Sequence, residues 1–171
     1  MAQVLCIGMT GMLAGCVRSL VARGDRVACI ARTQDSLTAL AETIPRADQP
    51  RISTHACDYR DLDAFDETLA TLSIEPRAAI CWVYSPAEPV IDWIQRRFPG
   101  IDLLRVIASA TQAPLCEGGN HHRTVRLGFV IENDQSRWLR DDEIARGVYE
   151  AFINNEHDAC IGVVEPWDRR P

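Results

Sequence analysis

The stretch that follows the first apolar run of the chain contains three glycines, and its residue types suit the binding of a phosphate. Residues 4–8 form that run and continue into Gly8-Met9-Thr10-Gly11-Met12-Leu13-Ala14-Gly15, after which apolar residues take helical spacing. Glycine permits a tight turn and a close approach to the backbone, and the start of a helix offers free N–H groups. The spacing therefore predicts a turn that binds the pyrophosphate of a dinucleotide, with Ala14 or Gly15 completing the glycine pattern. The expected contacts are Gly8, Thr10, Gly11, Met12 and Leu13. The alternative is a turn that uses glycine only for close packing.

The second apolar run ends in a basic residue at the place where an acidic residue would select NAD(H). In dinucleotide sites of this kind, a carboxylate about twenty residues after the glycines binds the ribose 2′-hydroxyl. Here residues 26–31 are followed by Arg32 and Thr33, and the next carboxylate, Asp35, falls inside the following helix. A guanidinium can instead bind a 2′-phosphate. We therefore predict NADP(H) as the cofactor, with Arg32 and Thr33 among its contacts. The alternative is that Arg32 is a solvated surface arginine.

The elements that must position these residues alternate along the whole chain. Continuous apolar runs predict strands, and the amphipathic patterns between them predict helices. The predicted strands are residues 4–8, 26–31, 52–57, 78–83, 103–108, 124–131 and 159–164. This alternation is typical of a parallel sheet covered by helices on both faces. We predict a single α/β domain over residues 1–171, a Rossmann-like, doubly wound parallel sheet.

Composition limits the classes of protein to consider. The 171 residues are 47% hydrophobic and carry a net charge of −6, which argues against a nucleic-acid partner. Neither a leader peptide nor an apolar run of about 18 residues is present, so we expect no membrane association. The seven cysteines lack paired spacing, which predicts a reducing, cytoplasmic setting. Cys6, Cys29, Cys81 and Cys160 lie in apolar runs, where we expect them to be buried.

With these residues placed, the chain resembles the short-chain dehydrogenase/reductase family, in particular its short atypical members. The resemblance is carried by the glycine turn, by Ala31-Arg32, and by Cys57-Asp58-Tyr59 after the third strand. It implies a dinucleotide site in which Asp58 lies near the adenine and Tyr59 belongs to the same cofactor-binding part. Residues 107–109 are similar to the strand that delivers a catalytic serine in the family, which implies that role for Ser109. Residues 126–130 resemble the family's sixth strand and the turn after it.

The chain departs from the family in its catalytic residues. The family uses a tyrosine as proton donor and a lysine four residues later, which lowers the pKa of the tyrosine and holds the ribose. This sequence contains no lysine, and its tyrosines are Tyr59, Tyr84 and Tyr149. The helix that would carry the pair is replaced by residues 111–123, which we predict to be a loop. The resemblance therefore implies the fold and the cofactor but not the family's mechanism.

Other side chains are candidates for the chemistry. Ligands of such sheets bind beyond the carboxyl ends of the strands, where Tyr84 and Ser85 follow the fourth predicted strand. Tyr84 is the predicted proton donor, and the alternative is a packing residue with a solvated hydroxyl. Ser85, His121 and His122 are predicted substrate contacts; solvated loop histidines are the alternative for the latter two. No metal site is expected.

Three functions remain open. The first is an NADP(H)-dependent reductase of a small organic molecule, which we expect to prefer a C=N or activated C=C group because no lysine activates a tyrosine. The second is a non-catalytic NADP(H)-binding regulator or partner protein, and the third is a cofactor-free enzyme of the same fold. We also expect a homo-oligomer, either a dimer or a tetramer, because the sheet has two edges and the resembled family hides apolar helix faces between subunits.

Overall fold

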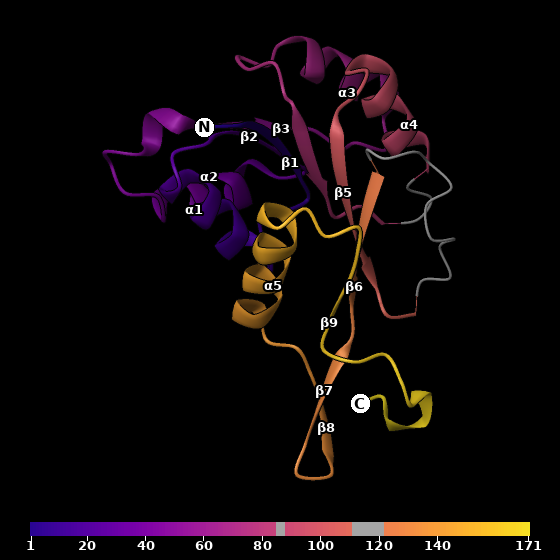
Figure 1. The fold of residues 1–171 in the computed structure, drawn as a ribbon. Coiled ribbons are helices and arrows are strands. Elements are labelled where there is room, and N and C mark those ends of the chain that lie inside the picture. The colour runs from indigo at the N-terminus through magenta and orange to yellow at the C-terminus, as the bar shows by residue number, and fades with distance from the viewer. Residues whose placement is uncertain (85–87, 111–121) are drawn as a thin grey trace.

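The computed structural model describes residues 1–84, 88–110 and 122–171, and it contains a seven-stranded parallel sheet (Figure 1). The strand order is β3-β2-β1-β4-β5-β6-β9. The strands are β1 (Gln3–Ile7), β2 (Arg26–Ala31), β3 (Ile52–Ala56), β4 (Ala78–Cys81), β5 (Asp102–Ala108), β6 (His122–Leu127) and β9 (Asp158–Ile161). Every pairing within this sheet is parallel, which confirms the predicted fold.

In the described ranges, five helices connect the strands and cover the sheet. They are α1 (Ala14–Ala22), α2 (Gln34–Glu42), α3 (Leu62–Ala70), α4 (Glu88–Arg97) and α5 (Asp141–Ile153), with short 3₁₀ turns at Gln49–Arg51 and Trp167–Arg169. One apolar core lies between the sheet and α1, α2 and α5; the other lies between the opposite face and α3 and α4. Alternate residues of one strand serve the two cores, as Cys6 and Leu5 of β1 do. This explains why the central strands β1 and β4 are apolar at nearly every position.

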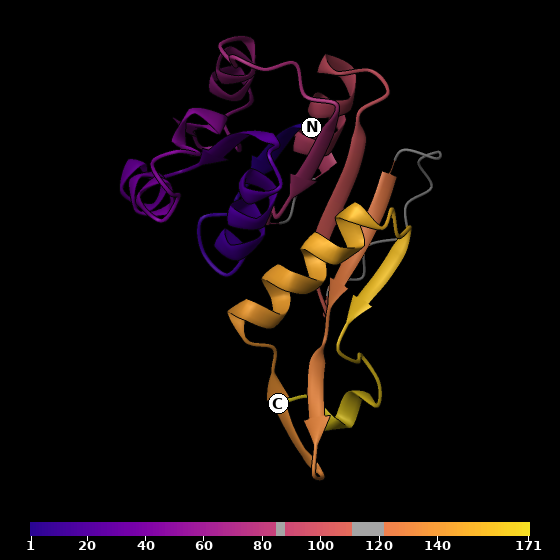
Figure 2. The same cartoon turned by 60° about the vertical axis from the view of Figure 1, so that its left-hand side comes forward.

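A two-stranded antiparallel hairpin extends beyond the sheet, and the sequence analysis missed it (Figure 2). The predicted strand over residues 124–131 is in fact β6 followed, after Gly128, by β7 (Phe129–Glu132), which pairs with β8 (Gln135–Trp138). A side chain at Gly128 would place its Cβ 2.2 Å from the carbonyl oxygen of Val163, so only glycine fits this close approach between β6 and β7. The predicted continuous strand is therefore wrong.

The segment after β9 packs against this hairpin. Phe129 and Val163 form a backbone bridge, and Arg169 donates to the carbonyl oxygen of Asp134 at the hairpin turn, at 2.6 Å. The Arg170 guanidinium lies 5.0 Å from the ring of Trp138 and 4.8 Å from that of Trp167. These contacts join the hairpin and residues 162–171 into one structural unit at the carboxyl end of β6.

None of the helices in the described ranges combines the length and the apolar character that crossing a bilayer requires. Of the cysteines expected to be buried, Cys6, Cys29 and Cys81 are so, whereas Cys160 is exposed. Cys160 lies on the edge strand β9, where the expectation of burial was wrong. Burial raises the pKa of the Cys81 thiol to about 12, so that thiol stays protonated at neutral pH.

Candidate functional site

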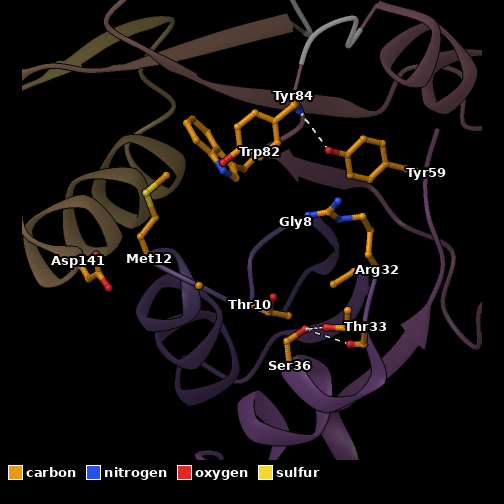
Figure 3. A pocket seen from close by; sticks show the side chains of 12 residues that line it. Gly8, Thr10, Met12, Arg32, Thr33, Ser36, Tyr59, Trp82, Tyr84 and Asp141 are labelled. Carbon is orange, nitrogen blue, oxygen red and sulfur yellow. Dashed lines mark hydrogen bonds between the residues drawn. The ribbon is translucent and has the colours of Figure 1, made fainter.

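A pocket of about 500 Å³ opens at the carboxyl ends of β1, β2 and β4 (Figure 3). Its volume is within the usual range for sites that bind small molecules. It brings together residues from distant parts of the chain: Gly8, Thr10, Gly11, Met12, Ala31, Arg32, Thr33, Ser36, Tyr59, Trp82, Tyr84 and Asp141. Seven of the predicted site residues are in this set, namely Gly8, Thr10, Gly11, Met12, Arg32, Thr33 and Tyr59, and the predicted proton donor Tyr84 is an eighth.

Gly8 makes the turn that ends β1. Its φ is +71°, and its N–H donates to the carbonyl oxygen of Ile30 at 3.0 Å. A Cβ at this position would lie 2.1 Å from the carbonyl oxygen of Trp82. Both the backbone conformation and the close neighbouring strand therefore require glycine here.

Gly11 and Gly15 have different roles. A Cβ at Gly11 would meet nothing within 4 Å, so the fold does not need glycine there, and the space it leaves is part of the pocket. A Cβ at Gly15 would lie 2.8 Å from the Cβ of Ala145, so Gly15 allows α1 to pack closely on α5. Leu13, which precedes α1, has its side chain buried in the core and does not line the pocket.

The end of β2 supplies a cationic side chain and two hydroxyls to the pocket. The Arg32 guanidinium points into it in Figure 3, with Thr33 and Ser36 beside it. The Thr33 hydroxyl donates to the Ser36 oxygen at 2.8 Å, and the Ser36 hydroxyl donates to the Thr33 carbonyl oxygen at 3.0 Å. The sequence analysis did not include Ser36, although its position three residues after Thr33, in the first turn of α2, was a usable signal.

Tyr59 and Asp58, which follow β3, lie in different places. Tyr59 lines the pocket, and its buried hydroxyl accepts the backbone N–H of Tyr84 at 3.2 Å. Asp58 instead lines a neighbouring cavity with Cys57 and Asp61. Hydrogen bonds from the Arg60 side chain, Nε to Oδ1 at 2.9 Å among them, lower the pKa of Asp58 to about 2. The carboxylate is therefore ionised and already bound by Arg60.

Two aromatic residues after β4 form one wall of the pocket. The rings of Trp82 and Tyr84 meet edge to face, with centroids 5.8 Å apart. Tyr84 is 66% exposed, so its side chain is accessible to a ligand. The sequence analysis selected Tyr84 but not Trp82. Ser85, the other candidate at this strand end, lies outside the described residues.

The remaining candidates are not lining residues of this pocket. Ser109 follows β5 and is buried. His122 begins β6 and pairs with Leu103, near the amino end of β5. It therefore lies at the amino ends of the strands, whereas the pocket lies at their carboxyl ends. Burial, followed by the charge of Arg105, lowers the pKa of His122, so its imidazole is neutral at pH 7. His121 lies outside the described residues.

Asp141, the first residue of α5, is a pocket residue that was not predicted from the sequence. It lies across the pocket from Arg32, with Met12 between it and Trp82 (Figure 3). It is the only carboxylate among the lining residues in the described part of the chain. Within the described ranges, no group of three or more His, Cys, Asp or Glu side chains is arranged to hold a metal ion.

Comparison with known proteins shows the fold of the chain. No protein-family model and no curated protein matches the sequence. Among solved structures, a short-chain dehydrogenase/reductase from Vibrio parahaemolyticus superposes with a TM-score of 0.72 at 11% identity, covering 93% of this chain and 98% of the other. A bulky-bulky ketone specific alcohol dehydrogenase from Comamonas testosteroni gives 0.72 at 13% identity, covering 98% and 90%. A serine dehydrogenase complexed with NADP⁺ gives 0.53 at 19% identity, covering 86% and 81%. The chain thus has the fold of the short-chain dehydrogenases/reductases, as the sequence resemblance implied.

Proposed function

We propose that this protein is an NADP(H)-dependent reductase of a small organic substrate. The observation that carries the proposal is the end of β2, where Arg32, Thr33 and Ser36 face the same pocket as the glycine turn. A guanidinium with neighbouring hydroxyls suits a ribose 2′-phosphate, whereas a 2′-hydroxyl is usually bound by a carboxylate. Among the described residues, the only carboxylate that lines the pocket is Asp141, which lies on the far side.

The residues present fit the cofactor. Gly11 leaves open space where a pyrophosphate would approach the start of α1, and Thr10 lines the same part of the pocket. Arg32, Thr33 and Ser36 would hold the phosphorylated ribose. A reduced nicotinamide, when bound, supplies a hydride to the substrate. The similarity in fold to a serine dehydrogenase complexed with NADP⁺ supports this assignment at the level of architecture.

Tyr84 is the residue that we assign to the proton. It is exposed at the pocket, and the N–H of its own backbone is fixed by the Tyr59 hydroxyl. The sequence contains no lysine that could lower its pKa. A ketone needs an acid to protonate the alkoxide that forms from it. An iminium needs none, because its nitrogen takes the electron pair of the C=N bond and is left neutral. We therefore propose C=N or activated C=C groups as substrates.

The second candidate is an NADP(H)-binding regulator or partner protein without turnover. One feature of the sequence favours this second candidate. The chain contains no lysine, so it lacks the pair of a tyrosine and a lysine four residues later. Ser109 supports catalysis less than expected, since it is buried and does not line the pocket. Its role, and those of Asp58, Ser85, His121 and His122, remain predictions.

The test of the function has two stages. In the first stage, NADPH and NADH are titrated into the protein while the fluorescence of the nicotinamide is recorded. We expect NADPH to bind tightly and NADH to bind more weakly. Oxidation of NADPH at 340 nm is then measured with a cyclic imine, an enone and a simple ketone. Consumption with the first two supports the reductase, and binding without consumption in any assay supports the regulator. Failure to bind either dinucleotide would overturn both.

We also propose that the protein is a cytoplasmic homo-oligomer, a dimer or a tetramer. In the described part of the chain, β3 and β9 are the edges of the sheet and have a free side for pairing. Apolar side chains at the surface, Trp138, Ile153, Val163 and Trp167, support an interface between subunits. Multi-angle light scattering at micromolar concentration decides this point, and a monomer would contradict it.

A further inference from the structure

The pocket has opposite charges at its two ends. Arg32 lies at one end, after β2, and Asp141 lies at the other, at the start of α5 (Figure 3). A dinucleotide phosphate is attracted to the first and repelled by the second. The carboxylate therefore has no evident use in binding the anionic part of the cofactor.

The carboxylates that neighbour Asp141 are all neutralised by arginines. Arg137 bonds Glu132 at 3.0 Å and Glu143 at 2.8 Å, and Arg140 lies 3.5 Å from Asp142. Asp141 itself has no ion pair within the described ranges. The two nearest arginines in sequence are thus engaged with other acids, so the charge of the exposed Asp141 faces the pocket and is stabilised only by the amino-terminal end of α5.

Aromatic side chains line the wall between the two ends of the pocket (Figure 3). Trp82 and Tyr84 meet edge to face, and Met12 lies between Trp82 and Asp141 (Figure 3). Aromatic ring faces attract cations, and tryptophan does so most strongly. A carboxylate and two aromatic rings around one cavity are a combination that favours an organic cation over an anion or a neutral molecule.

We infer that the part of the pocket lined by Asp141, Trp82 and Tyr84 recognises a cationic nitrogen of the substrate, such as an iminium or a protonated amine. The inference rests on the proposed function for the cofactor at the Arg32 end, and it names the substrate class of the same site. It also agrees with the absence of lysine, because a substrate that already carries its positive charge needs no strong acid from the protein. Asp141 is assigned to recognition and orientation of the cation, not to proton transfer.

The experiment compares the binding of an unreactive cation with that of a neutral molecule of similar size. N,N-dimethylpyrrolidinium and N-methylpyrrolidinone are titrated by calorimetry into the protein, with and without saturating NADPH. We expect the cation to bind the wild type more tightly than the neutral molecule. Asp141→Asn should lower the affinity for the cation roughly tenfold, as expected for a partly exposed charge pair. The affinity for the neutral molecule should not change.

Asp142→Asn is the matched control, since Asp142 is the next residue, is exposed, pairs with Arg140 and does not line the pocket. It should bind the cation as the wild type does. Trp82→Leu should also weaken the cation, while Trp82→Phe should retain most of the binding. Thermal melts of each variant verify that it is folded.

The inference is overturned if the wild type binds both molecules equally, or if Asp141→Asn and Asp142→Asn weaken the cation alike. It is also overturned if Asp141→Asn weakens NADPH and leaves the cation unaffected, because Asp141 would then be a contact of the cofactor. The proposed function fails separately, through a wild type that does not bind NADPH. The titration without NADPH would still decide the role of Asp141 in that case.

Discussion

Substitutions at Gly8 and Gly11 should separate a glycine that the fold requires from one that the ligand requires. Gly8→Ala places a Cβ 2.1 Å from the carbonyl oxygen of Trp82 at a φ of +71°. The left-handed backbone alone costs about 1–2 kcal/mol for alanine, and the clash with a strand carbonyl raises the total to roughly 3–5 kcal/mol. A Cβ at Gly11 meets nothing within 4 Å, so we expect Gly11→Val to change the free energy of unfolding by less than about 1 kcal/mol.

Gly8→Ala should therefore lower the thermal stability, whereas Gly11→Val should lower the affinity for NADPH. For a chain of this size we expect Gly8→Ala to lower Tm by roughly 6–20 °C, as measured by circular dichroism at 222 nm during a thermal melt. Gly11→Val should keep its Tm but lose at least about 100-fold in NADPH affinity, close to 2.7 kcal/mol, because the branched side chain occupies the space of the pyrophosphate. Gly11→Ala is the milder control. An unchanged Kd in Gly11→Val, or a wild-type melt in Gly8→Ala, would refute this division of roles.

Three further predictions follow from single side chains. Arg32→Ala should remove most of the preference for NADPH over NADH, a loss of about 1.5–3 kcal/mol in the titration of NADPH, and equal affinities in the wild type would contradict the assignment. Tyr84→Phe should slow NADPH oxidation with a cyclic imine about tenfold without abolishing it, and complete loss would show that the proton is essential. Hydrogen bonds from Arg137 hold the pKa of Glu143 at about 2, below its ordinary value of 4.5, so the stability from this contact is present above pH 4.5 and is lost as the pH falls toward 2. Glu143→Gln should flatten that acid dependence of Tm, and an unchanged slope between pH 5 and pH 2.5 would count against it.

The sequence was sufficient for the sheet because its signals are local. Continuous apolar runs such as residues 26–31 and 103–108 have the length and composition of buried parallel strands, and they were found with nearly correct bounds. The hairpin was missed because apolar residues occur on both sides of Gly128 in residues 124–131, and the contact that divides them comes from Val163, far along the chain. Asn133 and Asp134, with φ of 50° and 63°, were the local signal of a hairpin turn.

The parts of the site that a single strand and the turn after it form could be predicted from the sequence. The glycine turn and Arg32 are such cases, and the pocket contains them. Trp82 and Asp141 were not found, because their position beside the glycine turn depends on the order of strands and on the packing of α5 against α1. His122, by contrast, was predicted as a substrate contact but does not line the pocket. It begins a parallel strand and so lies at the amino ends of the strands, whereas ligands bind at the carboxyl ends.

The close packing of α5 has a mechanical consequence. Gly15 brings α1 against Ala145, and a Cβ at Gly147 would lie 2.6 Å from the side chain of Ile161, so α5 packs closely on α1 and on the Ile161 side chain of β9. A helix held on two sides in this way cannot shift without breaking both contacts. Asp141 therefore keeps a fixed separation from the glycine turn, and the pocket should select ligands by their length and rigidity instead of closing around them.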